Sequence, residues 1–213
     1  MSPDALAVLP PEYRLIVSAG AIRSGSTALF NMLRLLLEQN GTPLTAGWVD
    51  DVKEPLQRTI LVKIHEWHPL LSKRANVVFT CHRDLRYVVR SLGAMKWLDS
   101  SPATQIAHIV QNHTAWARTA ALDLRYEDMI ADLNQAVRRV AASLGVKDDG
   151  FDLAAITCEI ERLPPPTRSD HRYDPVSLMH KSHRHDNYAQ PLSQIEAEIH
   201  HQFAAWQAAR GYT

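Results

Sequence analysis

The sequence predicts an α/β protein, in which two layers of helices enclose a central parallel sheet to give a three-layer α/β/α arrangement. Short apolar runs rich in β-branched residues occur at 14–19, 59–64 and 76–81, and such runs are typical of strands buried on both faces. The segments between them carry apolar residues at helical spacing. Strands that alternate with helices predict a parallel sheet that is covered on both sides.

The first predicted strand, 14–19, runs directly into a loop that contains two glycines. The helix after this loop, 26–41, carries leucines every three or four residues and ends at Gly41. The strands at 59–64 and 76–81 come next along the chain. The order of strand, glycine loop and helix is therefore expected near the start of the chain.

The second half of the chain continues the alternation. A helix is predicted at 85–97, and Pro102 marks the start of another that continues to about residue 121. The composition of 122–126 predicts a fourth strand, and the helix after it is predicted to stop at Gly145. Each of these helices has an apolar side that could cover a buried sheet.

The last part of the chain is predicted to be helical at both ends. A helix at 151–163 is broken by three prolines, and a polar, histidine-rich stretch follows to about residue 190. Ser193 and Glu196 have the spacing of a capping box and predict the start of the final helix. The inner face of that helix is expected to consist of Ile195, Ile199, Phe203 and Trp206.

Length and composition limit the class of protein. The 213 residues are enough for a full core, so residues 1–213 are expected to form one domain. Hydrophobic residues make up 46% and charged residues 22%, as is usual for a globular protein in water. The 23 basic residues balance the 23 acidic ones, which argues against a broad nucleic-acid or membrane surface. Any anion site is therefore expected to be local.

Cysteine use and the N-terminus indicate a reducing compartment. Cys81 and Cys158 each lie in an apolar run, so both are expected to be buried thiols rather than a disulfide. The first residues lack a basic stretch followed by an apolar one, and no apolar run approaches the roughly 20 residues of a membrane helix. The expected location is the cytoplasm, with no membrane partner.

The stretch "GAIRSGST", residues 20–27, is close to the phosphate-binding pattern G-x-x-x-x-G-K-[ST]. Ser26 replaces the usual Lys, and a cation stands instead at Arg23. The glycines let backbone N–H groups converge beside a helix N-terminus, which favours an anion. Further hydroxyl donors come from Ser24, Ser26 and Thr27. Without the Lys this loop suits ATP or GTP poorly. The alternative to an anion site is a tight strand-to-helix turn that happens to contain two glycines.

A second anion site is indicated after the strand at 76–81. Arg83 comes just past the end of the strand, and Ser91 follows eight residues later. An Arg in this position faces the crevice where open α/β sheets bind ligands. The alternative is a solvated, basic helix start, since Arg86 and Arg90 lie between the two.

Four stretches, "GAIRSGSTAL", "KIH", "CHRDLRYVVRS" and "LRYEDM", occur in an order that resembles sulfotransferases using 3′-phosphoadenosine-5′-phosphosulfate (PAPS). The resemblance covers roughly residues 14–145, and "WQAARGY" is similar to the usual ending. It implies a P-loop NTPase-like sulfotransferase architecture, PAPS as sulfuryl donor and no metal. It also implies that the first loop, including Gly25, binds the 5′-phosphosulfate, and that Arg83 and Ser91 hold the 3′-phosphate.

Catalytic roles follow from the same resemblance. His65 comes just after the strand at 59–64 and two residues after Lys63, so both side chains can face one ligand. A His near its ordinary pKa suits a general base at pH 7. The resemblance assigns that role to His65 and stabilisation of the transferring group to Lys63, with Glu66 as a rival base. Arg23 cannot give up a proton, so it would stabilise leaving-group charge electrostatically.

Other residues have two interpretations each. The resemblance places Tyr126 against the adenine, whereas its position alone also fits the core. Lys181 and Arg184 could hold the 3′-phosphate, although the glycines that usually accompany such a segment are missing. His180, His183 and His185 could bind Zn²⁺, but the segment lacks a helical or Cys-bearing frame, so no metal is expected there.

The sequence thus predicts an enzyme that moves a sulfuryl group from PAPS to a hydroxyl or amine of a small-molecule or glycan acceptor. Trp48, Trp97 and Trp67 could line an acceptor pocket or belong to the core. One alternative is a P-loop kinase that uses ATP and Mg²⁺. The other is a nucleotide-binding module without catalysis.

Overall fold

The computed structural model describes residues 1–162, 173–179, 191 and 193–212. Its centre is a five-stranded sheet of order β2-β3-β1-β4-β5, in which every neighbouring pair is parallel. The strands are β1 (Arg14–Ser18), β2 (Leu44–Trp48), β3 (Thr59–Lys63), β4 (Val77–His82) and β5 (Leu122–Arg125). Strand β1 lies between β3 and β4, so the chain continues to opposite sides of β1 and leaves a crevice at the strands' carboxyl ends.

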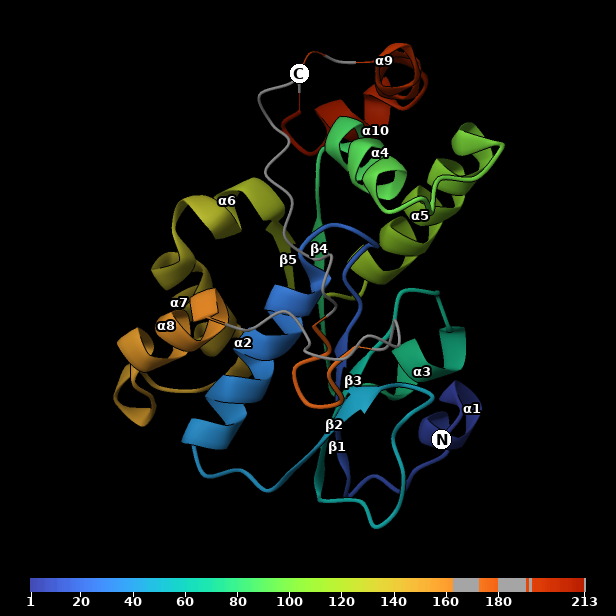
Figure 1. Cartoon of the computed structure of the whole chain (residues 1–213). Coiled ribbons are helices and arrows are strands. Elements are labelled where there is room, and N and C mark those ends of the chain that lie inside the picture. Colours follow the sequence, from blue (N-terminus) through green and yellow to red (C-terminus); the bar gives the residue numbers. More distant parts are fainter. Residues whose placement is uncertain (163–172, 180–190, 192, 213) are drawn as a thin grey trace.

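One face of the sheet is covered by α2 and by a group of helices from the second half of the chain (Figure 1). Leu29, Phe30 and Leu33 of α2 pack on Ile16 and Phe79 of the sheet in one buried cluster. The helices on this face are α2 (Ser26–Gln39), α6 (Tyr126–Ala131), α7 (Leu133–Leu144) and α8 (Leu153–Arg162), with the short 3₁₀ turn η1 (Asp148–Gly150) between the last two.

The other face carries a second buried cluster. Leu15, Val17 and Val62 alternate with the residues of the first cluster along their strands, and they pack with Leu6 and Trp116. The helices here are α1 (Pro3–Ala7), α3 (Pro69–Arg74) and α5 (Pro102–Ala117), while α4 (Leu85–Ala94), α9 (Gln194–Gln202) and α10 (Ala204–Ala208) pack at the upper end beside α5 (Figure 1). The predicted three-layer α/β/α arrangement is confirmed.

The structure also corrects several details of the prediction. Strand β2 was not predicted, because Pro43, Ala46 and Gly47 give its stretch the composition of a loop. The capping box of Ser193 is present, but the final helix divides in two at Phe203. Ile195, predicted on the inner face of that helix, is instead 42% exposed.

The two cysteines do not form a disulfide, as the sequence predicted. Cys81 and Cys158 are both free thiols, and Cys81 is buried whereas Cys158 is half-buried. Tyr126 begins helix α6 and does not end the strand before it. Among the helices in the described residues, none combines the length and apolar character needed to cross a membrane.

Candidate active site

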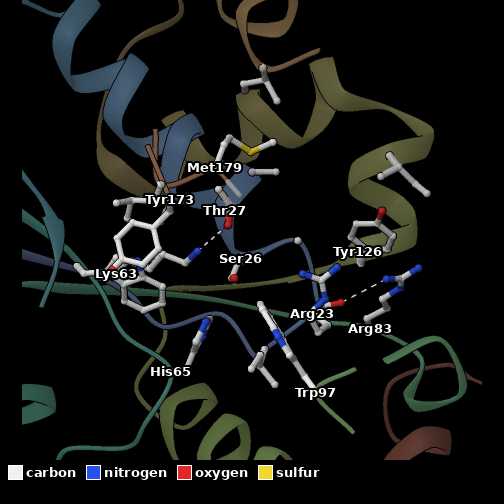
Figure 2. A pocket seen from close by; sticks show the side chains of 17 residues that line it. Arg23, Ser26, Thr27, Lys63, His65, Arg83, Trp97, Tyr126, Tyr173 and Met179 are labelled. Carbon is white, nitrogen blue, oxygen red and sulfur yellow. Dashed lines mark hydrogen bonds between the residues drawn. The ribbon is translucent and has the colours of Figure 1, made fainter. Parts of the chain in front are cut away.

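A cavity of about 450 Å³ opens at the carboxyl ends of the strands (Figure 2). It joins three stretches that lie far apart in the sequence: the loop after β1, the end of β3 and the residue after β4. The volume is in the usual range for a small-ligand site. The lining residues are Ile22, Arg23, Gly25, Ser26, Thr27, Ala28, Trp48, Lys63, His65, Arg83, Trp97, Tyr126, Ile130, Ile160, Tyr173, Leu178 and Met179.

The loop between β1 and α2 is held in a conformation that favours glycine. Gly25 has φ +81°, and Arg23 has φ +61°, which few non-glycine residues adopt. A Cβ on Gly25 would lie 2.7 Å from both Tyr126 Cδ2 and Met129 Cε. Gly25 is the N-cap of α2, so Ser26 and Thr27 lie at the positive end of that helix and line the cavity.

The sequence analysis expected Ser24 to face the ligand, but Ser24 does not line the cavity. Its side chain is fully buried, and its hydroxyl donates to the carbonyl oxygens of Ala21 and Cys81, the latter at 3.0 Å. The hydroxyl therefore fixes the loop against β4. Two of the three expected loop hydroxyls, those of Ser26 and Thr27, remain available to a ligand.

Lys63 is the last residue of β3 and is only 2% exposed. Its Nζ donates to Thr27 Oγ1 at 2.6 Å and lies 4.7 Å from the ring centroid of Trp48 (Figure 2). In the described part of the chain, Lys63 forms no ion pair with a carboxylate. Burial, with the charge of Arg23 adding to it, lowers the pKa of Lys63 to about 7.

His65 lies beyond the end of β3, and its Nδ1 is 2.6 Å from the carbonyl oxygen of Gly20. A carbonyl oxygen only accepts, so the hydrogen bond requires the proton on Nδ1 and leaves Nε2 as a lone pair. The ring meets Trp48 edge-on at 5.1 Å. Burial and then the charge of Lys63 lower the pKa of His65 to about 3, so the imidazole is neutral at pH 7.

Glu66, the rival base, points away from the cavity. It is exposed, and its carboxylate accepts from Asn112 Nδ2 at 2.9 Å and lies 3.1 Å from His108 Nε2. His68, nearby, caps α3, since its Nδ1 accepts from the backbone N–H of Leu71 at 3.1 Å. Of these three neighbouring titratable residues, His65 alone lines the cavity.

The far end of the cavity is strongly basic. The guanidinium of Arg83 lies 4.3 Å from the ring centroid of Tyr126 and donates to the carbonyl oxygen of Arg23 at 3.3 Å. Arg23 Nε in turn donates to Ser91 Oγ at 2.8 Å. Burial, followed by repulsion from Arg83, lowers the pKa of Arg23 to about 10. Arg23, Arg83, Ser91 and Tyr126 thus form one group.

The other two arginines after β4 are engaged elsewhere. Arg86 forms an ion pair with Asp84, the N-cap of α4, and Arg90 forms one with Glu196 at 2.8 Å. The first pair lies within the start of α4, and the second connects α4 to α9, so the alternative of a simple solvated basic helix start does not describe this segment. Arg83 alone of the three lines the cavity.

The remaining wall is aromatic and aliphatic. Trp48 and Trp97 lie in it, whereas Trp67 packs edge-on against Trp116 in the core at 4.8 Å. The sequence analysis missed Tyr173, because nothing near the proline-rich stretch signals a return of the chain to the cavity. Its ring centroid lies 5.8 Å from that of Trp48. Lys181, Arg184 and the histidines 180, 183 and 185 lie outside the described residues.

Neither the comparison with protein-family models nor that with curated proteins finds a match. Among solved structures, mouse sulfotransferase SULT7A1 complexed with PAP aligns with TM-score 0.66 and 10% identity over 98% of this chain and 88% of that one. Two structures of retinol dehydratase, one with androsterone and PAP and one with retinol and PAP, have TM-scores of 0.49 and 0.48. Their identities are 14% and 15%, over 71% and 73% of this chain and 65% of each of theirs. The chain therefore has the sulfotransferase fold that its motifs resemble.

Proposed function

We propose that the chain is a sulfotransferase that moves a sulfuryl group from PAPS to a hydroxyl or amine of a small molecule or glycan. The buried amine of Lys63, which has no carboxylate partner among the described residues, is the observation that carries this proposal. A buried charge is costly without an opposite charge, and the described residues give Lys63 only a hydroxyl and an aromatic face. An anionic ligand in the cavity would offset that cost. The PAP bound to the mouse sulfotransferase of the same fold supports a nucleotide of this type.

The donor would lie along the basic wall of the cavity. Ser26, Thr27 and the N-terminal amides of α2 would hold the 5′-phosphosulfate. Arg83 and Ser91 would hold the 3′-phosphate, and the ring of Tyr126 would contact the adenine. Arg23 stands between the two ends: its backbone belongs to the loop, and its guanidinium lies beside Ser91.

Transfer would proceed in line. A bond forms between the acceptor oxygen and sulfur, while the bond from sulfur to the bridging oxygen breaks and releases adenosine 3′,5′-bisphosphate. Nε2 of His65 takes the acceptor proton, and Lys63 and Arg23 stabilise the charge spread over the transferring group. Burial and then the charge of Lys63 lower the pKa of His65, and the negative donor would raise it by offsetting that charge. This step needs no metal.

A binding titration tests the proposal against its alternatives. Calorimetry with adenosine 3′,5′-bisphosphate is expected to give tight, Mg²⁺-independent binding, with ATP and Mg²⁺ binding at least tenfold more weakly. The reverse order would favour the P-loop kinase. Normal binding of the bisphosphate with no sulfuryl transfer to any tested phenol, alcohol, amine or glycan would favour the non-catalytic module.

A further inference from the structure

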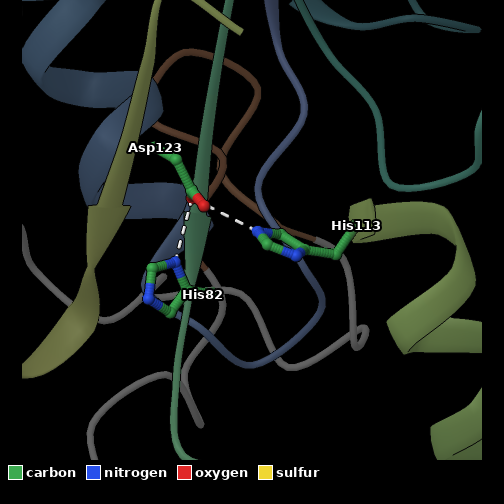
Figure 3. A group of neighbouring side chains, drawn as sticks. All are labelled: His82, His113 and Asp123. Atoms are coloured by element: carbon green, nitrogen blue, oxygen red, sulfur yellow. Dashed lines mark hydrogen bonds and ion pairs between the residues drawn. The ribbon is translucent and has the colours of Figure 1, made fainter. Parts of the chain in front are cut away.

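A second cluster of polar side chains is formed by His82, His113 and Asp123 (Figure 3). His82 ends β4, Asp123 lies in β5, and His113 comes from α5. Consecutive strand residues point to opposite faces. Arg83 consequently lines the first cavity, whereas His82, the residue before it, lines a second one.

The three side chains converge on one point. Asp123 Oδ1 lies 3.0 Å from His82 Nδ1 and 3.2 Å from His113 Nε2, and one ligand atom of each residue lies within 4.8 Å of the others. Ligand atoms at about 2.0–2.1 Å from a metal ion are separated from their neighbours by roughly 2.8–3.0 Å in octahedral and 3.3–3.4 Å in tetrahedral geometry. The two observed separations match such edges.

The chemistry of the three groups also suits a metal. Two imidazoles and one carboxylate are ligands that Zn²⁺ and similar transition metals accept. Burial lowers the pKa of His113, and hydrogen bonds from both histidines hold the pKa of Asp123 below its usual value. At neutral pH His113 is therefore neutral and Asp123 ionised, which are the forms that bind metal.

A route and an open position are present. A cavity of about 510 Å³ borders His82 and Asp123, and its other walls include Arg125, Arg139 and Arg210. His113, by contrast, is fully buried behind them. A metal at the cluster would have its fourth position toward this cavity, where the arginines favour an anionic ligand or hydroxide.

From this geometry we infer that His82, His113 and Asp123 form a binding site for one divalent transition-metal ion of the Zn²⁺ type, open to the arginine-lined cavity. His113 Nδ1 has no hydrogen-bond partner among the described residues. Coordination through Nε2 would leave that Nδ1–H unsupported, and the lack of such support weakens metal sites by about 10–100-fold. The site is therefore expected to be weaker than a fully supported zinc site.

The test uses metal-free, untagged full chain in which His180, His183 and His185 are replaced by Gln, so that the histidine-rich stretch cannot contribute. Zn²⁺ is titrated by calorimetry, and Co²⁺ by its visible absorption. One equivalent of each is expected to bind. His113→Gln and Asp123→Asn should each weaken binding at least tenfold, whereas His201→Gln, which changes an exposed histidine of α9, should leave it unchanged.

Circular dichroism and binding of adenosine 3′,5′-bisphosphate establish that each variant is folded. Absence of metal uptake by the parent protein overturns the inference and leaves a purely hydrogen-bonded triad. Uptake that survives His113→Gln in a folded variant also overturns it. Should both variants fail to fold, His82→Gln and a zinc-induced rise in the melting temperature of the parent take their place. An unchanged melting temperature would then count against the site.

Discussion

Lys63 is the residue whose charge state decides how strongly the cavity attracts an anion. Its pKa of about 7 in the protein alone lies far below the ordinary value of 10.5. A bound phosphate or sulfate would raise that pKa, so binding above pH 7 must take up a proton. The affinity for an anionic nucleotide is thus linked to pH through this side chain.

The affinity for adenosine 3′,5′-bisphosphate is expected to fall as the pH rises from 7 to 9, by up to about tenfold per pH unit. Below pH 7, where Lys63 is already protonated, its contribution is fully present. Calorimetry across this range measures the slope. In Lys63→Met, which cannot titrate, the affinity should be weaker and nearly flat with pH. A steep slope in that variant would assign the proton to another group.

His65→Ala is expected to lower turnover by roughly 10²–10⁴ while nucleotide affinity stays near normal, because we propose that the imidazole takes up the acceptor proton. Steady-state sulfuryl transfer and calorimetry measure the two effects. Glu66→Gln is the matched control, since Glu66 is the next residue and faces solvent. If the Glu66 variant loses turnover and the His65 variant keeps it, the assignment of the base is reversed.

Arg83→Ala is expected to weaken the affinity for adenosine 3′,5′-bisphosphate by about 10–100-fold, because a hydrogen bond to a charged group is lost. Adenosine 5′-phosphosulfate, which lacks the 3′-phosphate, should lose much less. Arg86→Gln provides the control, because Arg86 is paired with Asp84. Equal losses of affinity for both nucleotides would show that Arg83 does not bind the 3′-phosphate.

At the scale of the element, the backbone conformation of the loop between β1 and α2 decides how the loop packs against its neighbours. Gly20 and Gly25 are needed for different reasons. A Cβ on Gly20 would lie 2.5 Å from Cys81 Sγ, whereas Gly25 combines a positive φ with contact to Tyr126. The loop is thereby packed against β4, which Arg83 follows directly, and against α6, which begins at Tyr126.

Gly25→Ala is expected to lower the melting temperature and to weaken nucleotide binding at least tenfold. The left-handed conformation costs a non-glycine residue about 1–2 kcal/mol, and the new Cβ displaces Tyr126. Gly93→Ala is the matched control, since Gly93 lies in helix α4 with nothing within 4 Å of its added Cβ. That change should stabilise by about 0.5–1 kcal/mol. Normal binding by Gly25→Ala would mean that the loop adapts freely.

Elements with a strong local pattern were the ones that the sequence predicted. The leucine spacing of α2 and the apolar runs of β1, β3 and β4 encode their own conformation. Strand β2 has no such pattern, since its pairing with β3 stabilises Leu44–Trp48 against a weak local preference. The contact of Gln207 with Asp84, at 2.9 Å, likewise joins segments far apart in the chain and follows no local pattern.

At the scale of the whole molecule, buried neutral histidines link stability to acidity. Burial lowers the pKa of His65 and of His113 below the ordinary 6.5. Below pH 6.5 the unfolded chain therefore binds protons that the folded chain does not, and stability falls as the pH falls. The sign is that of a base kept neutral by folding.

When thermal unfolding is monitored by calorimetry, the melting temperature should thus be lower at pH 5 than at pH 7. His113, which is buried, contributes up to about 1.4 kcal/mol per pH unit below 6.5, and His65, which is half-buried, contributes less. One transition is expected at pH 7, because we propose that residues 1–213 form a single domain. His113→Phe should reduce the pH dependence. An unchanged melting temperature between the two pH values would contradict the low pKa of these histidines.

The sequence by itself determined the parallel α/β class, the glycine loop at 20–27 and the placement of Lys63 and His65 at one cavity, because each depends on residues close together in the chain. Only the tertiary structure decided that Ser24 bonds to the backbone of β4, that Arg23 donates to Ser91, and that Tyr173 lines the cavity. It also brought His82, His113 and Asp123 to one point from three separate elements. Spacing along a chain fixes local conformation, whereas contacts between distant segments depend on how the helices pack on the sheet, and no short pattern records that packing.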